Sequence, residues 1–384
     1  MERLNMKKKI CFISVDPDFL GGISLYTKNI IKILKKRNPL LEITWIYRGG
    51  KNKSFWKEGV DYHEFKVLKI PFLEEIIFNK KIKTFLNKNF FEIINSHALW
   101  GYWMKHYKKK KNQKIVHTYH GTTYYFYKNH LRRFNLIKKI LIYFSLFYGF
   151  LIEKPPIKKA GKIICVSEHV KKELESLYNF KNNLFVIRTG VDLKKFKERK
   201  KKEVYKKLNI PENLTYGLYV GRGGFWTKGL DKIINLSKEI YKLNKNFRLI
   251  IIGAEENKIK HLLDHRFTIL LPPQSREDIL YYYGASDIFF SMSRCEGGAP
   301  TMVTSEAMAS GCLIVTDKEA NQEIINDKEN GLIVEGNYAK EAERILKTIK
   351  NKNEVKQIIN NSLKTIKDLS LEKWGERYIE VLLK

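Results

Sequence analysis

The stretch IFFSMSRCEGGAPTMVTSEAMASGCLIV, residues 288–315, decides the fold because it joins two apolar strands through a small-residue loop and a helix. Ile288–Phe290 has the apolar character of a buried strand, and Cys312–Val315 has that of the next strand. Between them, Glu296–Thr301 predicts a turn and Glu306–Ser310 predicts a helix. Strand–loop–helix junctions of this kind place ligands at the carboxyl ends of parallel strands.

The loop in this stretch has the composition of a diphosphate-binding loop. Gly297, Gly298 and Ala299 allow backbone N–H groups to approach a diphosphate closely, and the helix beyond presents its positive dipole end to the same anion. The nearby carboxylates of Glu296 and Glu306 would then hydrogen-bond sugar or ribose hydroxyls. Alternatively, Glu306 only supplies negative charge in the first turn of a helix, which is worth about 0.3 to 1 kcal/mol.

Apolar strand-like runs alternate with helical patterns along both halves of the chain. The first half contains five such runs and a helical pattern over Ile23–Lys36: Ile10–Val15, Ile43–Tyr47, Ile93–Ser96, Ile115–Tyr119 and Ile163–Val166. The second half repeats the rhythm, with a helical pattern over Leu230–Leu243: Tyr216–Val220, Arg248–Ile252, Phe267–Leu270, Ile288–Ser291 and Leu313–Val315. This rhythm predicts an α/β fold with parallel sheets.

A chain of 384 residues is too long for one typical core, so two Rossmann-like domains are expected. The charged stretch KKFKERKKK, residues 194–202, follows Gly190-Val191-Asp192 and is a plausible linker between them. Hydrophobic residues make up 43% of the chain, which excludes a disordered protein.

The formal net charge of +31 predicts attraction to anions such as nucleic acid, acidic lipid surfaces or phosphorylated substrates. Much of this charge is lysine scattered through the sequence, so part of it is explained equally well as a solvated surface. Charge alone does not choose among these partners.

The four cysteines show no Cys-x-x-Cys spacing and no cluster with histidine at metal-ligand spacing: Cys11, Cys165, Cys295 and Cys312. Buried free thiols in a reducing compartment are the simplest account, and a structural zinc site is not expected. The start, MERLNMKKKICFISV, passes from a basic stretch directly into a short strand-like run, without the pattern of a signal peptide. We therefore expect a cytoplasmic protein.

The hexapeptide EAMASG, residues 306–311, resembles the second half of the glutamate-pair signature of the family 4 retaining glycosyltransferases, or glycosyl transferases group 1. The family usually has eight positions between its two glutamates, whereas Glu296 precedes Glu306 by ten. A two-residue expansion of the loop keeps Glu296 in the catalytic, sugar-facing role. The alternative register puts Gly298 at that place, and the carboxylate is then absent or supplied from elsewhere.

The resemblance implies the GT-B fold, in which two Rossmann-like domains with parallel sheets face each other across an interdomain cleft. It also implies that a C-terminal helix, here carrying Trp374, crosses back to the first domain. We therefore expect an N-terminal, acceptor-side domain at residues 1–192 plus 370–384, and a C-terminal, nucleotide-sugar-binding domain at residues 193–369.

Residues 219–222 and 228–229, YVGR and KG, resemble the family motif Val-Gly-Arg…Lys-Gly, which implies that Arg222 and Lys228 clamp the donor diphosphate. Two cations there would neutralise charge that grows on the departing nucleotide diphosphate. The resemblance implies further contacts with the donor: Gly21, Gly22, Pro300 and Thr301 at the diphosphate, Glu306 at the ribose, and Leu271 and Pro272 in the base-contacting loop.

His120 follows the run Ile115–Tyr119 and matches the family's strand-end histidine, which implies a catalytic hydrogen bond to the donor sugar. A carboxyl-terminal strand position is where this fold exposes reactive groups. His117 is the alternative, but strand alternation places it with Tyr119 rather than with His120. His97 ends another strand and resembles a common family position, so it is a further candidate.

The resemblance also implies retention of the anomeric configuration, by same-face attack in which the leaving phosphate helps to deprotonate the acceptor hydroxyl. No Asp-x-Asp manganese motif stands at a strand end. Because Arg222 and Lys228 could replace a metal ion, we expect no metal and no cofactor beyond the nucleotide diphosphate sugar, which is the donor substrate.

The segment Leu131–Leu151, LRRFNLIKKILIYFSLFYGFL, combines arginine and lysine with dense apolar and aromatic residues. One interpretation is an amphipathic segment against an anionic membrane that carries a lipid-linked acceptor. The other is a buried interdomain helix, since the uninterrupted apolar part is short for a transmembrane span. The basic, aromatic stretch Trp100–Lys114 could extend the same face or border the acceptor cleft.

The resemblance implies a retaining hexosyltransferase that moves a hexose from a nucleotide diphosphate sugar to a glycan or lipid-linked acceptor. Contact with the membrane would place it at the inner face of the cell membrane. A sugar nucleotide epimerase of the same fold is one alternative, and it would need additional acid/base carboxylates. A basic module for nucleic acid or an anionic surface is another, but it does not explain Arg222, Lys228 and Glu306 together, so no specific nucleic acid is expected.

Overall fold

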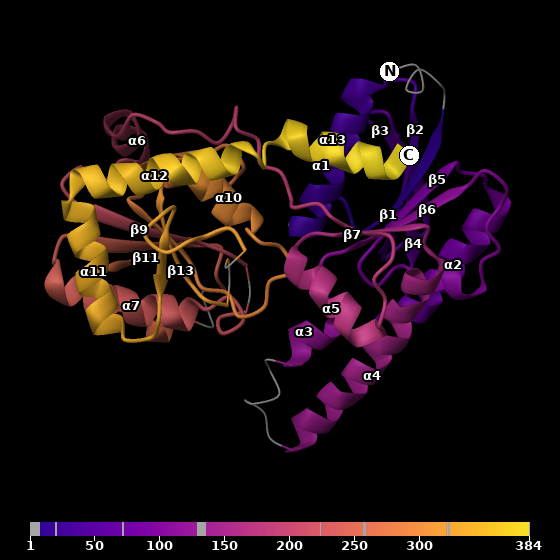
Figure 1. Ribbon diagram of the computed structural model, residues 1–384, viewed down its shortest axis with the longest axis horizontal. Helices are drawn as coiled ribbons and strands as arrows, with labels where there is room; N and C mark the ends of the chain where they lie inside the picture. The colour runs from indigo at the N-terminus through magenta and orange to yellow at the C-terminus, as the bar shows by residue number, and fades with distance from the viewer. Residues whose placement is uncertain are drawn as a thin grey trace. The chain divides into compact units, whose positions relative to one another are not determined.

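The computed structural model describes residues 8–19, 21–70, 73–128, 136–222, 224–255, 259–319, 321 and 323–383 (Figure 1). The chain divides into two compact units. The first unit comprises Met1–Arg188 and Glu372–Lys384, and the second comprises Thr189–Leu371. The boundaries expected from the sequence, at 192/193 and 369/370, lie a few residues from these.

The first unit is built on an eight-stranded sheet with the strand order β3-β4-β2-β1-β5-β6-β7-β8. Neighbouring strands are parallel except for β3 and β4. The strands are β1 (Lys9–Ile13), β2 (Glu42–Gly49), β3 (Lys53–Lys57), β4 (Val60–Lys66), β5 (Ile93–His97), β6 (Lys114–Tyr119), β7 (Lys162–Cys165) and β8 (Leu184–Val186). The helices are α1 (Gly22–Arg37), α2 (Glu74–Lys88), the 3-10 helix η2 (Tyr102–His106), α3 (Thr123–Lys128), α4 (Leu136–Lys159) and α5 (Glu168–Tyr178).

The second unit contains a six-stranded, all-parallel sheet with the order β11-β10-β9-β12-β13-β14. Its strands are β9 (Thr215–Val220), β10 (Phe247–Ile252), β11 (Thr268–Leu271), β12 (Ile288–Ser291), β13 (Leu313–Asp317) and β14 (Leu332–Val334). Its helices are α6 (Lys201–Leu208), α7 (Leu230–Leu243), the 3-10 helix η4 (Lys260–Leu262), α9 (Ile279–Ala285), α10 (Met302–Ala309), α11 (Tyr338–Lys350) and α12 (Lys352–Lys367). Two parallel-sheet α/β units are therefore present, as the sequence predicted.

The central strands are buried on both faces, which explains their nearly continuous apolar sequence. In β1, Ile10, Cys11, Phe12 and Ile13 are all fully buried. Every residue of β12 and β13 is likewise buried. Helices cover both faces of such parallel sheets, so the alternation of apolar and polar residues seen in half-exposed strands is absent.

The C-terminal helix α13 (Leu371–Leu383) packs in the first unit, as the resemblance implied. Trp374 is buried, and its ring lies 4.8 Å from that of Tyr26 on α1. Lys162, at the start of β7, donates a hydrogen bond of 3.0 Å to the carbonyl of Val381. The chain therefore ends in the unit in which it begins.

The antiparallel pair β3–β4 is not evident from the sequence, because its segments are rich in lysine, glutamate and aspartate. The two strands are joined by a two-residue turn at Glu58 and Gly59, both with positive φ (51° and 78°). Such turns match the twist of a β-hairpin, and glycine takes this backbone conformation without strain. β3 lies at the edge of the sheet, where one strand edge faces no partner and charged residues are favoured.

Candidate functional site

The second unit has a topological switch point at β9, which pairs with β10 on one side and β12 on the other. In open parallel sheets, the loops that follow the two diverging strands leave a crevice at their carboxyl ends, where ligands bind. Here those loops are residues 221–229, after β9, and residues 292–301, after β12. The residues predicted to bind the donor diphosphate in this unit, Arg222, Lys228, Pro300 and Thr301, all lie in them.

A close backbone approach joins the two loops at Gly229. Gly229 has φ +68°, and a Cβ there would lie 1.8 Å from the carbonyl oxygen of Met292. Arg294 adds side-chain contacts, since its guanidinium donates to the Trp226 carbonyl (2.6 Å) and to both carboxylate oxygens of Asp231 (2.7 and 2.8 Å). The glycine of the Lys-Gly pair is thus required by geometry, and Arg294 is an organising residue that the sequence motifs did not identify.

Lys228 and Glu296 meet across these loops. The Lys228 ammonium lies 2.5 Å from Oε1 of Glu296, and the Ser293 hydroxyl donates to the same oxygen at 2.8 Å. Both charged side chains are partly shielded, with 34% of Lys228 and 19% of Glu296 exposed. The predicted diphosphate cation and the predicted sugar-facing carboxylate are therefore direct neighbours. Arg222 is exposed and follows the last residue of β9 by two positions.

Helix α10 begins directly after this loop, with Thr301 as its N-cap. The Thr301 hydroxyl accepts a hydrogen bond from the Thr304 N–H at 3.3 Å, and the Thr301 N–H donates to Asn321 Oδ1 at 3.4 Å. Thr304 in turn donates to Ser291 at the end of β12 (2.9 Å). This network fixes the helix start against the strand end. Pro300 is buried immediately before the cap.

Glu306 lies in the second turn of α10, so the alternative that it merely adds charge to a first turn is wrong. The helix starts four residues earlier than expected, because Thr301 caps it. Glu306 is buried, with only 3% of the residue exposed. It accepts hydrogen bonds from the Arg276 guanidinium (2.7 Å) and from the Tyr283 hydroxyl (3.0 Å). Burial, followed by the Glu306 charge, raises the pKa of Tyr283 well above its usual value and keeps it a donor.

Arg276 connects Glu306 to the loop after β11, where the base contact was predicted. Leu271 ends β11 and its carbonyl accepts a hydrogen bond from the Gly253 N–H (3.1 Å), while Pro272 is exposed. Arg276 follows four residues later and also stacks over the ring of Phe196, 5.0 Å from its centroid. The structure thus brings the predicted ribose carboxylate and the predicted base loop together. Nothing in the local sequence distinguishes Arg276 from the many other cations.

The first unit has its own switch point at β1, which pairs with β2 and β5. The predicted residues of this unit again follow the carboxyl ends of the central strands. Gly21 is the N-cap of α1 and Gly22 is its first residue. A Cβ at Gly21 would lie 2.5 Å from the ring of Phe19, so a larger residue would displace that side chain.

Two histidines meet at the ends of β5 and β6. His97 is the last residue of β5, and His120 directly follows β6. His97 Nδ1 lies 3.0 Å from His120 Nε2, and the rings are stacked with centroids 5.3 Å apart. His117, the alternative candidate, lies within β6, is fully buried and hydrogen-bonds Ser96 at 2.7 Å. His120 keeps partial exposure, yet burial of its imidazole lowers its pKa to about 3.

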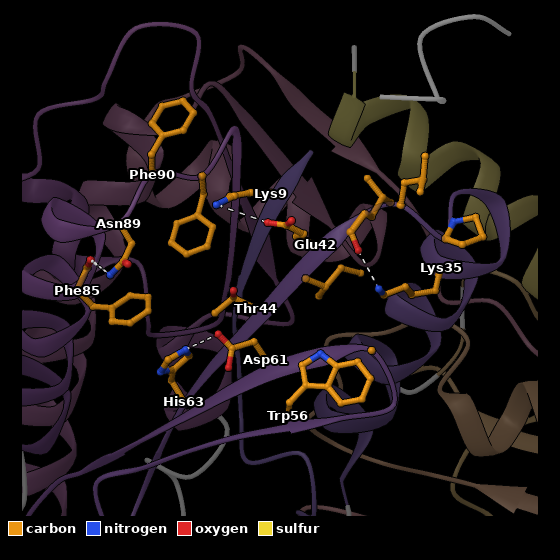
Figure 2. A pocket seen from close by; sticks show the side chains of 16 residues that line it. Lys9, Lys35, Glu42, Thr44, Trp56, Asp61, His63, Phe85, Asn89 and Phe90 are labelled. Carbon is orange, nitrogen blue, oxygen red and sulfur yellow. Dashed lines mark hydrogen bonds and ion pairs between the residues drawn. The ribbon is translucent and has the colours of Figure 1, made fainter. Parts of the chain in front are cut away.

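A separate pocket of about 660 Å³ opens at the opposite end of the first unit's sheet (Figure 2). Its lining includes Lys9 and Glu42 at the starts of β1 and β2, together with Asp61 and His63 of β4 and the exposed Trp56 of β3. Because the strands are parallel, this amino-terminal end is remote from His97 and His120. None of the predicted site residues lines this pocket.

Among the described residues, no group of three His, Cys, Asp or Glu side chains is arranged to hold a metal ion. All four cysteines are buried, and none of them forms a disulfide bond. Metal-independent activity stays a prediction.

Comparisons with known proteins cover nearly the whole chain. Residues 20–195 match the family model described as Glycosyltransferase Family 4, and residues 200–365 match that of Glycosyl transferases group 1. An uncharacterized glycosyltransferase of Methanocaldococcus jannaschii is 27% identical over 375 residues, which are 95% of either chain.

Solved structures with the same architecture include sucrose-phosphate synthase of Thermosynechococcus elongatus, with a TM-score of 0.79 and 17% identity over 97% of this chain and 98% of that one. Another is HepE of Anabaena in complex with UDP-glucose, with a TM-score of 0.72 and 16% identity over 98% and 99% of the two chains. At these identities the likeness concerns the fold, which is that of the GT-B proteins.

Proposed function

Because the chain belongs to the group 1 glycosyltransferases of family 4, we propose that it transfers a hexose, with retention, from a nucleotide diphosphate sugar to a glycan or lipid-linked acceptor. Membership confirms the resemblance on residues 306–311 and makes the chain a transferase. The epimerase and the nucleic-acid module are not favoured.

The observation that carries this proposal is the grouping of Arg222, Lys228 and Glu296 at the carboxyl ends of β9 and β12. A nucleotide diphosphate sugar offers a diphosphate for the cations and sugar hydroxyls for the carboxylate, side by side in one molecule. HepE, whose fold this chain shares, has been solved with UDP-glucose. Glu306, held by Arg276 and Tyr283, would bind the ribose hydroxyls of the same ligand.

The reaction needs few groups from the protein. The bond between the anomeric carbon and the diphosphate oxygen breaks, and its electron pair goes to that oxygen, where Arg222 and Lys228 stabilise the growing charge. The acceptor oxygen bonds to the anomeric carbon from the same face, and its proton passes to the leaving phosphate. Orientation of the substrates is then the main contribution of the fold.

The acceptor side of the proposal rests on α4. Among the described helices, this is the one that is long and apolar enough to cross a membrane, over Lys138–Lys159. About a third of its most apolar 18-residue stretch is buried. It extends away from the sheet of the first unit (Figure 1). Its large apolar side chains are exposed to between 46% and 62% along most of its length: Ile140, Leu141, Tyr143, Phe144, Phe147 and Leu151. Residues 131–135 of the predicted segment lie outside the described residues.

An exposed apolar face of this size is unusual on a soluble surface and fits the interface of a bilayer, where lysines nearby would meet anionic headgroups. Lipid contact through α4 would place the enzyme at the inner face of the membrane, next to a lipid-linked acceptor. Two prolines, Pro155 and Pro156, lie in its last turns, which makes a surface-bound helix a better fit than a straight span.

Donor binding is tested by thermal unfolding of the protein with UDP-, GDP- and ADP-linked sugars and the free nucleotides, with and without manganese. A ligand at a hundred times its Kd stabilises the native state by about 2.7 kcal/mol. We expect one nucleotide series to raise the Tm without manganese, and Lys228→Ala to abolish that rise. No rise with any nucleotide sugar would contradict the proposed donor site.

A further inference from the structure

We propose that Asn95, His97 and Tyr378 are positioning residues that fix the tautomer of His120, with its proton on Nε2 and a lone pair on Nδ1. The inference rests on the proposed function, in which His120 hydrogen-bonds a sugar. We call the chain of contacts Tyr378–Asn95–His97–His120 the histidine relay. It joins α13, β5 and the residue after β6 within the first unit.

The histidine relay consists of three hydrogen bonds, of which two are buried and the one to His120 is partly buried. Tyr378 Oη donates to Asn95 Oδ1 at 2.6 Å. The same oxygen lies 2.9 Å from His97 Nε2, and His97 Nδ1 lies 3.0 Å from His120 Nε2. Asn95, His97 and Tyr378 are fully buried. In each contact, one group donates a proton directly to the other, without a bridging water.

The orientation of the Asn95 amide determines which atom donates and which accepts in each hydrogen bond of the histidine relay. Its Nδ2 lies 3.3 Å from the carbonyl oxygen of Val116 and 3.2 Å from the Thr118 hydroxyl. A carbonyl oxygen can only accept, so the NH₂ end of the amide must face Val116, and Oδ1 must face His97. The reverse orientation would set two oxygens against each other in a buried place, which costs free energy.

The Thr118 hydroxyl completes this assignment. It lies 3.1 Å from Tyr378 Oη, and it accepts from Asn95 Nδ2. Since the Tyr378 proton is directed at Asn95, Thr118 donates its own proton to Tyr378. All three polar groups are then satisfied in one closed ring.

The tautomers of His97 and His120 follow from this assignment of donors and acceptors. Asn95 Oδ1 is an acceptor, so His97 carries its proton on Nε2, and neutral His97 has its lone pair on Nδ1. That lone pair faces His120 Nε2, which must therefore bear the proton. His120 Nδ1 is left as an acceptor, and no described residue is hydrogen-bonded to it.

The surroundings keep both rings neutral. Burial, and then the neighbouring His120, lower the pKa of His97 well below its usual value, and burial lowers that of His120 to about 3. Aromatic rings pack around the pair, with Tyr26 4.8 Å from His120 and 5.8 Å from His97. A neutral acceptor at Nδ1 suits a hydroxyl group, which can donate, and disfavours a phosphate oxygen, which cannot. The relay thus makes the end of β6 selective for sugar hydroxyls.

The direct test is a spectrum of the protein labelled with ¹⁵N in its imidazole rings, at pH 7.5. Protonated and unprotonated ring nitrogens have well-separated shifts, and variants of single histidines assign them. We expect His97 and His120 both to be protonated on Nε2 and bare on Nδ1. In Asn95→Leu, His97 Nε2 loses the acceptor that fixes its proton, so His97 and His120 should each populate both tautomers. A wild-type His120 protonated on Nδ1, or unchanged tautomers in Asn95→Leu, would overturn the proposal.

Transfer kinetics give a second readout. His97→Ala should lower kcat/KM about tenfold, the effect of one hydrogen bond, and should cause no further loss in a His120→Ala background. Ser96→Ala is the matched control, because it removes the buried Ser96–His117 hydrogen bond and leaves the histidine relay intact. Additive losses in the double variant would contradict the relay. Because the spectra require no activity, failure of the proposed function would leave them informative.

Discussion

Lys228 and Glu296 form an ion pair with 2.5 Å between Nζ and Oε1, linking the loops after β9 and β12 at the switch point of the second unit. The two residues are separated by 68 positions in the sequence. Ser293 holds the same carboxylate oxygen, so the pair is fixed from a second side. In the proposed function, a diphosphate bound by Lys228 would share this ammonium with Glu296, and the carboxylate would then lie next to the first sugar atoms beyond the phosphates.

Replacement of Glu296 by Gln should separate sugar recognition from nucleotide binding. Transfer should fall at least tenfold, because the amide is a weaker acceptor for sugar hydroxyls than a carboxylate. The free nucleoside diphosphate should bind no more weakly than to the wild type, since Lys228 loses a competing anion. Calorimetric titration and initial rates measure the two effects. Unchanged transfer would favour the register in which Gly298 takes this place and Glu296 has no sugar-facing role.

Arg276→Ala should destabilise the second unit and weaken donor binding. Glu306 would keep a buried charge with Tyr283 as its remaining described partner, which costs on the order of 1 to 3 kcal/mol. Urea unfolding and the KM for the donor are the measurements. Arg266→Ala is the matched control, because Arg266 is 74% exposed and pairs with Asp264 at the surface. Equal effects of the two substitutions would refute the role of Arg276.

The stability of the first unit should depend on the ionisation of Glu173. The Thr122 hydroxyl, two residues after His120, donates to Glu173 Oε2 at 2.8 Å, and burial raises the pKa of Glu173 to about 7. The folded state therefore holds this proton more tightly than the unfolded chain, where a glutamate titrates near 4.3. The protonated carboxyl therefore adds its full contribution to the free energy of unfolding below about pH 4.3. This contribution, about 4 kcal/mol at most, is lost as the pH rises through 7.

Glu173→Gln should remove this dependence. The difference in stability between variant and wild type should change between pH 5 and pH 8 in favour of the variant, measured by urea unfolding at each pH. Glu175→Gln, on the same helix α5, is the matched control for the substitution itself. A constant difference for Glu173→Gln would show that its carboxyl titrates normally in the folded state.

Anionic vesicles should bind the protein through α4. Replacing both Phe144 and Phe147 by Ser should reduce co-sedimentation with vesicles containing phosphatidylglycerol at least tenfold, because each buried phenylalanine contributes about 1.5 to 3 kcal/mol. Trp56→Ser on β3 is the control, since this ring is 73% exposed yet lies on another element. If the wild type does not bind the vesicles, or if the double variant binds them equally well, membrane contact through α4 is excluded.

The sequence predicts the elements that hold the site better than the contacts within it. β12 and α7 have the bounds that periodicity predicts, because buried strands and amphipathic helices leave a continuous local pattern. The switch-point loops could be located because glycine, arginine and lysine there follow a recognisable motif. The start of α10 was misplaced, since its cap is a threonine inside a run of small residues with no local feature to single it out.

The partners that orient the site residues could not be predicted. Arg276 and Glu306 are 30 residues apart, and Tyr378 and Asn95 are 283 apart, so only the tertiary fold brings them together. A sequence with this many cations offers no reason to choose Arg276. Likewise, a C-terminal tyrosine gains its role only once α13 has packed in the first unit.

The central claim is that this chain releases a nucleoside diphosphate from a nucleotide sugar with the help of Lys228 and passes the sugar on with retention. The most direct measurement is turnover of the donor identified by binding, with the anomeric configuration of the product read from its proton spectrum. We expect an α-linked donor to give an α-linked product, a loss of about 10²-fold or more in Lys228→Ala, and near wild-type turnover in Lys201→Ala, whose ion pair with Asp287 lies at the amino end of β12. A β-linked product, or equal turnover in the two lysine variants, would contradict the account.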